Sequence, residues 1–254
     1  MSVTKLSNAL LRTGPFRPCR LHQFQCLNYE TVWDWQKQLQ KARFRKQIPD
    51  VLMTVSHPKV YTLGRGGDVN NILFDMNDPN YKLYKIERGG QVTHHYPGQL
   101  VAYPILNLNY YGKDLHLYLR MMEEVIIRTL FHFDIEAGRE EGMTGVWVNG
   151  KKIAAMGMYV SRWITMHGIS LNVYNDLDGF KKIIPCGLKG KEVCCMEEYV
   201  PNISMDIVRK RFLGEFEDVF QTQFYLGSRT SPLDCDQPQA PSYVQTYYNT
   251  FKMN

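Results

Sequence analysis

The chain has 254 residues, a length that predicts one large domain or one domain with a small cap. Hydrophobic residues make up 44% of it, enough to build a core, which excludes a chain that is disordered throughout. The formal net charge of +5 is too small to indicate nucleic-acid binding, and no apolar run approaches the ~18 residues of a membrane-spanning helix.

The start of the chain is basic and free of acidic residues as far as Glu30. Lysine and arginine mixed with serine and threonine are typical of an organelle-targeting segment, although an ordinary flexible N-terminus has the same composition. We expect a leader over residues 1–20, a folded domain over residues 21–227 and a polar tail over residues 228–254. The leader predicts a plastid or mitochondrial location, and a cytoplasmic one if it is not a targeting signal.

The cysteines are expected to be reduced thiols, because this long chain does not begin with the pattern of a secretory leader. No pair has the C-x-x-C spacing of a structural zinc site. The adjacent histidines His94 and His95 are poor partners for one ion, because neighbouring strand residues point to opposite faces. We therefore predict no metal site. The cysteines are Cys19, Cys26, Cys186, Cys194, Cys195 and Cys235.

The first predicted helix covers residues 31–46, with Trp35, Leu39 and Ala42 on its inner face. Strand candidates follow at residues 51–55, 60–63, 81–86 and 100–106. Because proline has no N–H to donate to a sheet, Pro104 places the last of these strands at an edge or next to a bulge.

Two glycine-rich segments lie between these strands. Residues 64–67 have neither the P-loop pattern nor the spacing of a dinucleotide fingerprint, so we predict no nucleotide site there. In the second segment, Gly89 and Gly90 allow a ligand to approach the backbone, and Arg88 can hold a carbonyl or carboxylate group. The alternative for this segment is a strand, a turn and a second strand with a bulge.

Two longer helices are predicted on either side of the central part of the chain. Residues 114–133 carry apolar side chains at helical spacing, expected to face the core, and Asp114 is the expected N-cap. Residues 204–220 form the second helix, which Ser204 can cap. Its expected inner face consists of Val208, Phe212, Phe216, Val219 and Phe220.

Between these helices, residues 146–155 predict a β-hairpin, because Asn149-Gly150 is a two-residue turn in which both residues accept a positive φ. Lys151 and Lys152 then point to opposite faces of the second strand. The strand continues through residues 156–160. Residues 163–173 form two short strands, or one strand that bends at Gly168, and a helical turn is expected at residues 176–183.

A Pro-Cys-Gly corner follows. Pro185 restricts the backbone before Cys186, and Gly187 permits a sharp exit. A cysteine on such a corner and a lysine such as Lys152 can form a nucleophile and its activator if they meet, which the spacing alone does not show. Backbone N–H groups near Gly157 or Gly187 are candidates for stabilising an oxyanion.

Four motifs of the chain together resemble the octanoyltransferases of lipoate biosynthesis, the lipoyl(octanoyl) transferase family. They occur in the right order and are RGGQVTHHYPGQL, GVWVNGKKIAAMG, WITMHGISLNV and IIPCG. The segments DLHLYLR and SRWITMHG are most similar to the cyanobacterial and plastid branch. The resemblance implies an α+β fold like that of biotin and lipoate protein ligases, with a central mixed β-sheet and flanking helices.

The resemblance also implies an activity. An octanoyl group would pass from octanoyl-acyl carrier protein, through a cysteine thioester, to a lysine of lipoyl domains. The expected acceptors are the lipoyl domains of 2-oxoacid dehydrogenase E2 subunits and the glycine cleavage H protein. Because the donor is already a thioester, no ATP and no cofactor are required. We expect a monomer with no membrane span and no nucleic-acid partner.

The site residues follow from the same motifs. Cys186 matches the acyl-thioester nucleophile of the family, and Lys152, not Lys151, matches its lysine, expected within hydrogen-bond reach of the thiol, directly or through water. Met156 and Met158 are expected to border the acyl pocket. The predicted substrate-binding residues are Arg88, Gly89, Gly90, Gln91, Val92, Thr93, His94, His95, Ala155, Met156, Gly157, His167, Gly168, Ile169 and Ser170.

Several residues depart from the usual family pattern. Tyr96 stands where a glycine is usual, His94 where a tyrosine is usual, and Ser170 where an alanine is usual. We expect these differences to bear on pocket shape and acyl-length preference. The vicinal pair Cys194-Cys195 is interpreted as two small buried side chains rather than a redox switch.

Two alternatives remain open. An ATP-dependent lipoate or biotin ligase on the same fold would need loops that hold phosphates and would not need Cys186. A non-catalytic module would bind lipoyl domains or acyl carrier protein without turnover.

Overall fold

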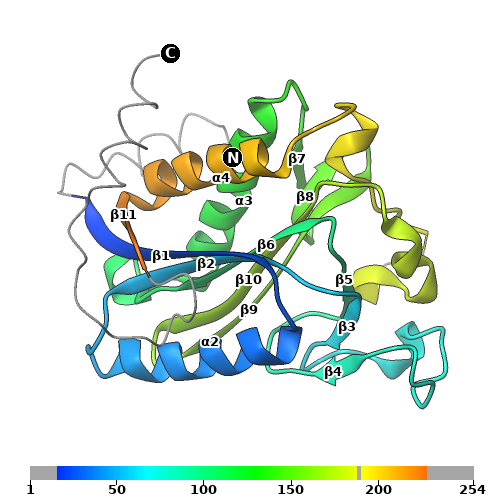
Figure 1. Ribbon diagram of the computed structural model, residues 1–254, viewed down its shortest axis with the longest axis horizontal. Coiled ribbons are helices and arrows are strands. Elements are labelled where there is room, and N and C mark those ends of the chain that lie inside the picture. Colours follow the sequence, from blue (N-terminus) through cyan, green and yellow to red (C-terminus); the bar gives the residue numbers. More distant parts are fainter. Residues whose placement is uncertain (1–15, 188–189, 228–254) are drawn as a thin grey trace.

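Eight strands form a mixed sheet at the centre of the molecule (Figure 1). The computed structural model describes residues 16–187 and 190–227. The strands of the sheet are β1 (Arg17–Cys26), β2 (Asp50–Ser56), β6 (Gln99–Ile105), β7 (Gly138–Glu140), β8 (Met143–Val148), β9 (Lys151–Ser161), β10 (Ile164–Asn172) and β11 (Thr222–Leu226). Their order is β11-β1-β2-β6-β10-β9-β8-β7. Strand β1 runs parallel to β2 and β11, and the other neighbours are antiparallel.

Helices cover both faces of this sheet. Helix α2 (Tyr29–Phe44) lies on one face, and α3 (Leu115–Phe131) and α4 (Met205–Phe220) lie on the other (Figure 1). Strand β2 is buried along its whole length because it has helices on both sides. Leu52 belongs to the core under α3 and α4, whereas Met53 and Val55 belong to the core under α2. The α+β class with a central mixed sheet and flanking helices is confirmed.

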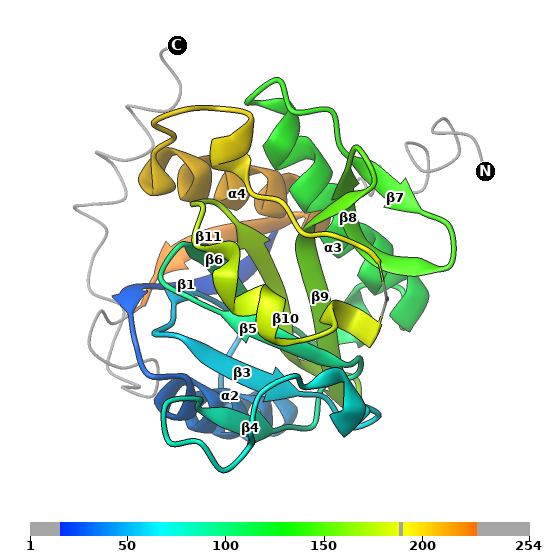
Figure 2. The ribbon, with the colours of Figure 1, turned by 90° about the vertical axis from the view of Figure 1, so that its right-hand side faces the viewer.

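A second, three-stranded sheet has the order β4-β3-β5 and consists of β3 (Val60–Leu63), β4 (Leu83–Lys85) and β5 (Val92–His95). Figure 2 shows it below the large sheet and close to α2. On one of its faces, the His94 ring packs on Tyr61 and Tyr96, with Phe180 edge-on to it. This aromatic cluster joins the small sheet to the 3₁₀ segment Leu177–Lys182, where a helical turn was predicted.

The two long helices after the small sheet agree closely with prediction. The carboxylate of Asp114 accepts from the N–H groups of His116 and Leu117, so it is the N-cap of α3. Ser204 occupies the N-cap position of α4, although its side chain makes no capping hydrogen bond. The buried residues of α4 are those predicted for its inner face: Val208, Phe212, Phe216, Val219 and Phe220.

The inner face of α2 differs from prediction. Val32, Gln36, Leu39 and Arg43 are buried, whereas Trp35 and Ala42, expected at the centre of the face, lie at its margin. The polar residues turn inward because the sheet offers them partners. Arg43 Nε bonds Asp50 Oδ1 at 2.6 Å, and Gln36 Oε1 accepts from the N–H of His167 at 2.8 Å.

Of the two alternatives for residues 163–173, the single strand is correct, but β10 bends at His167, where φ is +63°, and not at Gly168. The bend explains how Pro104 is accommodated in a central strand. This proline lies in β6 between β2 and β10, so the edge position was wrong and a local irregularity is present instead. The β6–β10 ladder is interrupted opposite His167 and resumes at the Asn107–Ile164 bridge without a change of register. The missing N–H of Pro104 therefore falls where β10 offers no partner.

The start of the folded part was placed too late, and two strands near its ends were missed. Strands β1 and β11 were not predicted, because β1 has arginine, histidine and glutamine among its apolar residues and no continuous apolar run. Since β1 begins at Arg17, the folded part starts before Leu21, where the domain was expected to begin. Most of the predicted leader and all of the predicted tail lie outside the described residues.

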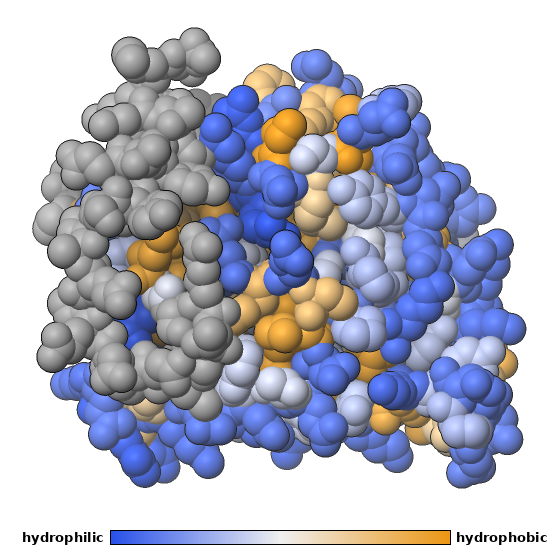
Figure 3. All heavy atoms as spheres, viewed as in Figure 1, coloured by the Kyte–Doolittle hydropathy of each residue, from blue (hydrophilic) through white to orange (hydrophobic). Residues whose placement is uncertain are grey.

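The described surface is largely polar. On the face in Figure 3, hydrophilic side chains predominate and hydrophobic ones form small separate patches. In residues 16–187 and 190–227, we found no helix with the length and apolar character needed to cross a membrane.

The aromatic cluster predicts an acid-dependent loss of stability. Burial lowers the pKa of His94 from 6.5 to about 4, so the unfolded chain binds a proton between these pH values that the folded chain does not. We expect His94→Phe, which keeps a ring of similar shape, to flatten the dependence of unfolding free energy on pH in this window by up to ~1.4 kcal/mol per pH unit. Urea denaturation from pH 7 to pH 5 measures this slope.

His116→Phe is the matched control, because His116 is exposed at the start of α3. It should leave the slope unchanged. Equal slopes for wild type and His94→Phe would contradict the prediction.

Candidate active site

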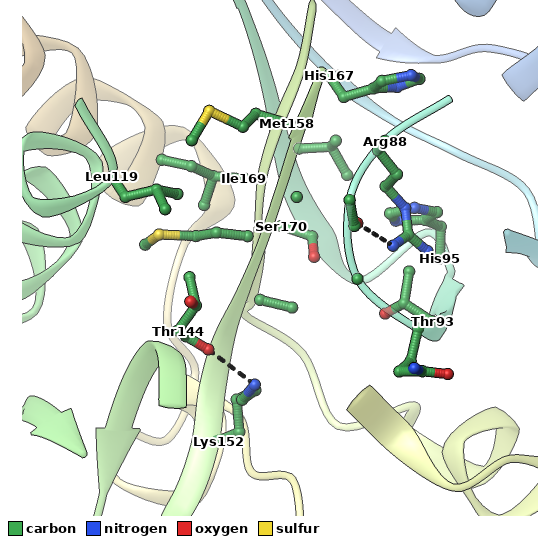
Figure 4. A pocket seen from close by; sticks show the side chains of 18 of the residues that line it. Arg88, Thr93, His95, Leu119, Thr144, Lys152, Met158, His167, Ile169 and Ser170 are labelled. Carbon is green, nitrogen blue, oxygen red and sulfur yellow. Dashed lines mark hydrogen bonds between the residues drawn. The ribbon is translucent and has the colours of Figure 1, made fainter. Parts of the chain in front are cut away.

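One cavity brings together most of the residues that the motifs single out. Its volume is about 390 Å³, within the ~300–1,000 Å³ of small-molecule sites. It lies along β9 and β10, between α3 and the segment that leads into β5 (Figure 4). Strand β9 is only partly buried from Ala155 to Ser161, and Ala155 to Met158 of this stretch form the cavity floor.

All but one of the predicted substrate-binding residues line this cavity, together with Lys152. The exception is His94, whose ring is in the aromatic cluster on the opposite face of β5 from His95. The structure brings the other residues together, and their part in binding substrate stays a prediction. They are Arg88, Gly89, Gly90, Gln91, Val92, Thr93, His95, Ala155, Met156, Gly157, His167, Gly168, Ile169 and Ser170.

Of the three positions where we expected departures from the family pattern, two lie away from the cavity and one lines it. Tyr96 is fully buried, stacks on His94 and donates its hydroxyl to the Tyr174 carbonyl at 2.8 Å. Neither Tyr96 nor His94 lines the cavity, and their rings stack on each other inside the aromatic cluster. Ser170 does line the cavity.

Several lining residues were missed by sequence reasoning. Leu119 belongs to the apolar stripe of α3 that was assigned to the core, and it reaches the cavity from the margin of that stripe. Its role was not detectable because an apolar residue on a helix has the same pattern in a core and in a pocket wall. The other missed residues are Tyr29, Val101, Tyr103, Gly142, Met143 and Thr144.

Lys152 is held by its backbone and by its side chain. Its N–H donates to the Glu192 carbonyl at 2.9 Å, and its carbonyl accepts from the N–H of Cys194 at 3.0 Å. On its other side the residue pairs with Trp147 in β8. The side chain is 6% exposed, and its Nζ donates to the Thr144 carbonyl at 3.0 Å and lies 4.7 Å from the Trp147 ring centroid. The ammonium is therefore fixed at the cavity wall (Figure 4).

The β8–β9 hairpin explains why Lys152 and not Lys151 faces the cavity. Asn149 and Gly150 have φ values of +50° and +75°, so the predicted turn is confirmed. It directs successive side chains to opposite faces. Lys151 lies outside and pairs with Glu192 at 2.7 Å, and this partner raises the pKa of Lys151.

The corner that carries Cys186 packs next to the cavity. Pro185–Gly187 forms a 3₁₀ turn, and the preceding Ile184 N–H donates to the Asn71 carbonyl at 2.8 Å. A Cβ on Gly187 would lie 3.2 Å from Gln91 Cγ, and Gln91 lines the cavity. We expected the Gly187 N–H to be a candidate for stabilising an oxyanion. It donates instead to the Ile184 carbonyl at 3.1 Å, so it is not available for that role. The side chain of Cys186 lies outside the described part, and its distance to Lys152 stays a prediction.

Arg88 fastens the glycine segment to the protein. Its Nη2 donates to the carbonyl and hydroxyl oxygens of Thr62 at 2.6 and 2.9 Å, and its Nη1 donates to the Gly89 carbonyl at 3.0 Å. The Gly89 N–H donates to the Met158 carbonyl at 2.8 Å, on β9. The guanidinium thus holds this loop against β3, while the loop itself is bonded to the cavity floor.

His95 lines the cavity on the side of β5, and a polar group of side chains behind it holds its ring. His95 Nδ1 is 3.0 Å from Gln99 Oε1, and the Gln99 amide nitrogen donates to the carbonyl of His94 and to Asn172 Oδ1. These acceptors orient the Gln99 amide, so His95 donates through Nδ1 and carries its lone pair on Nε2. Burial keeps the pKa of His95 well below 6.5, so the ring is neutral at pH 7.

Comparisons with known proteins agree with this geometry. Residues 28–217 match the family model described as the lipoyl protein ligase A/B catalytic domain. The octanoyltransferase of Synechococcus elongatus is 49% identical, over 81% of this chain and 88% of the relative. That of Gloeobacter violaceus is 48% identical, over 81% and 91%.

Solved structures show the same fold at low sequence identity. Lipoate-protein ligase A bound with ATP has a TM-score of 0.68 at 16% identity, covering 84% of this chain and 89% of the other. The bipartite lipoate protein ligase of Thermoplasma acidophilum, described with its E2 lipoyl domain, has a TM-score of 0.66 at 17% identity, covering 83% and 87%.

The floor of the cavity predicts a strict requirement for glycine at position 168. Gly168 pairs with Gly157 across β9 and β10, and a Cβ on Gly168 would overlap the Ala102 carbonyl oxygen in β6. We expect Gly168→Ala to lower the free energy of unfolding by about 2–3 kcal/mol, measured by urea denaturation, because backbone would have to move. Gly66→Ala, with open space around its Cβ, should change it by less than ~0.5 kcal/mol. Equal losses would refute this account.

Proposed function

The chain belongs to the family of lipoyl protein ligase A/B catalytic domains and, within it, to the octanoyltransferases, and from this membership we propose how its own residues transfer an octanoyl group to lipoyl domains. The donor is octanoyl-acyl carrier protein, and the group passes through a thioester on Cys186. The observation that carries this proposal is the buried ammonium of Lys152 at the cavity wall, next to the region where the Cys186 corner packs on Gln91.

The first half-reaction exchanges one thioester for another. A free thiol with a pKa of ~8.5 is only about 3% ionised at pH 7. In the starting state the proton of Cys186 is already on Lys152, and this ammonium stabilises the thiolate. The thiolate attacks the octanoyl carbonyl, the C–S bond to the carrier breaks, and Lys152 returns the proton to the departing thiolate.

The second half-reaction forms an amide. The neutral amine of the target lysine attacks the Cys186 thioester and loses a proton to Lys152, and the C–S bond breaks to release the Cys186 thiolate. The Cys186 thiolate and the Lys152 ammonium are thereby present again, which is the starting state. Thioester aminolysis is downhill, so the whole sequence needs no ATP.

The acyl chain lies along the apolar wall. Leu119, Met158 and Ile169 lie on one side of β9 and β10 (Figure 4), and Met143 and Met156 extend this lining. The polar group around His95 is on the other side. Burying the alkyl chain on the apolar side stabilises it by roughly 0.8 kcal/mol per methylene, and this leaves the carbonyl near Lys152.

The acceptors are the lipoyl domains of 2-oxoacid dehydrogenase E2 subunits and of the glycine cleavage H protein, whose target lysines enter at the same cavity. One chain supplies the cavity wall, Lys152 and the Cys186 corner, which supports action as a monomer.

The leading residues direct the enzyme to a plastid or a mitochondrion. Their acid-free composition and the likeness to cyanobacterial octanoyltransferases support this proposal. Arg17 pairs with Thr222 and Cys19 with Asp50, so cleavage after residue 20 would remove paired strand residues. We expect a mature N-terminus before Arg17, measured by N-terminal sequencing of the protein recovered from organelles. Failure of a residue 1–16 fusion to leave the cytosol would sink the proposal.

The two lysines of the hairpin provide a matched test of the mechanism. With octanoyl-acyl carrier protein and no ATP, wild type should gain the mass of one octanoyl group, and Cys186→Ser should form no thioester adduct. Lys152→Met should slow acylation by about a hundredfold or more, because it removes the acid and base. Lys151→Met removes only a surface ion pair and should stay within about threefold of wild type. Rapid-quench mass spectrometry measures these rates.

The same assay separates the alternatives. Free octanoate with ATP should not modify a lipoyl domain, whereas an ATP-dependent ligase would do so. Wild type that binds octanoyl-acyl carrier protein but forms no adduct would be a non-catalytic module, and the mechanism would be abandoned.

A further inference from the structure

A buried carboxylate on α3 is part of the wall that holds Lys152. Glu123 is 1% exposed, although the sequence pattern assigned this face of the helix to the apolar core. Its Oε2 accepts from Arg120 Nη1 at 2.6 Å and from Arg139 Nε at 2.9 Å. Its Oε1 accepts from the backbone N–H of Gly145 at 3.1 Å. Both oxygens therefore have donors, as a buried carboxylate requires.

The bond to Gly145 connects this carboxylate with Lys152. The Gly145 N–H and the Thr144 carbonyl belong to one peptide group. Glu123 accepts at the nitrogen end of this group, and the Lys152 ammonium donates to its oxygen end at 3.0 Å. A carboxylate at the N–H polarises the peptide and makes its carbonyl oxygen a stronger acceptor. One peptide thus links a buried anion to a buried cation.

The same peptide determines where the lysine side chain lies. Gly145 has a φ of +127°, and a Cβ at this position would lie 3.2 Å from Lys152 Cε and 3.4 Å from its Nζ. The absence of a side chain lets the lysine pass directly over the peptide. A small rotation of the peptide plane would therefore move the carbonyl that receives the ammonium.

Two residues on one face of helix α3 contribute to the cavity region. Leu119 lines it, and Glu123 lies one turn further along the same face of the helix. Arg139 also bonds Glu124 at 2.8 Å, so the arginine on β7 is held by two neighbouring carboxylates. Only Glu123 of these two bonds the peptide next to Lys152.

We propose that Glu123 is a positioning residue for the acyl transfer: through the 144–145 peptide it holds the Lys152 ammonium at the cavity wall. This inference rests on the function proposed above for Lys152. A role limited to folding would be met by the ion pairs to Arg120 and Arg139. Those ion pairs do not account for the bond from the Gly145 N–H, which connects Glu123 through the 144–145 peptide to the Lys152 side chain.

The test is a double-mutant cycle on the rate of acylation by octanoyl-acyl carrier protein. Glu123→Leu should lower the single-turnover rate at saturating donor by about tenfold or more with little change in the donor concentration at half-saturation, because the lysine is displaced and the donor site is not. Glu123→Gln keeps an oxygen for the Gly145 N–H and should recover part of the rate. In the Lys152→Met background, Glu123→Leu should have no further effect.

Glu124→Gln is the matched control, since it disturbs the same Arg139 without touching Gly145. It should stay within about twofold of wild type. A rate loss from Glu123→Leu that is equally large in the Lys152→Met background would overturn the inference, as would wild-type rates in Glu123→Leu. If that variant does not fold, the rates of Glu123→Gln in the wild-type and Lys152→Met backgrounds are compared in the same way. A Lys152→Met enzyme as fast as wild type would instead reject the proposed function itself.

Discussion

The burial of one lysine ammonium at the edge of the cavity constrains much of the surrounding structure. A charged group that is 6% exposed needs a close acceptor, and the Thr144 carbonyl supplies it. The acceptor can approach because position 145 is glycine, and its peptide is oriented by Glu123. The backbone of Lys152 is itself bonded on both sides, to β8 and to the strand-like segment around Val193. Helix, hairpin and sheet therefore meet at this single side chain.

The wall opposite Lys152 is formed by the glycine segment around Arg88, where backbone groups approach one another closely. The facing glycines Gly157 and Gly168 carry no side chain. The Arg88 side chain and the Gly89 carbonyl can therefore approach Gly157, and Arg88 binds the glycine segment to β3. His94 and Tyr96, where we expected departures from the family pattern, lie behind this wall, in the aromatic cluster. The His94 ring packs on Tyr61 and Phe180, and the other residues from Arg88 to His95 line the cavity.

The fold is shared with lipoate protein ligases at 16–17% identity, which shows architecture and not chemistry. The proposed mechanism rests on the family motifs and on the residue types that they bring to the cavity. An acyl group that arrives as a thioester needs a thiol to receive it and a group that moves protons. The chain has Lys152 on β9 at the cavity wall, and the corner that carries Cys186 packs next to the cavity.

Sequence alone determined the features that depend on near neighbours in the chain. The Asn149-Gly150 turn, the Asp114 cap and the five inward residues of α4 follow from backbone preference and helical period, which act over a few residues. Tertiary structure decided what depends on distant partners. Gln36 is buried because its side chain accepts from the N–H of His167 on β10. Pro104 lies in a central strand because β10 bends opposite it. Strand β1 forms because β2 and β11 flank it. Glu123 belongs to the same group, because a carboxylate on an apolar stripe acquires a role only when Gly145 and two arginines are folded against it.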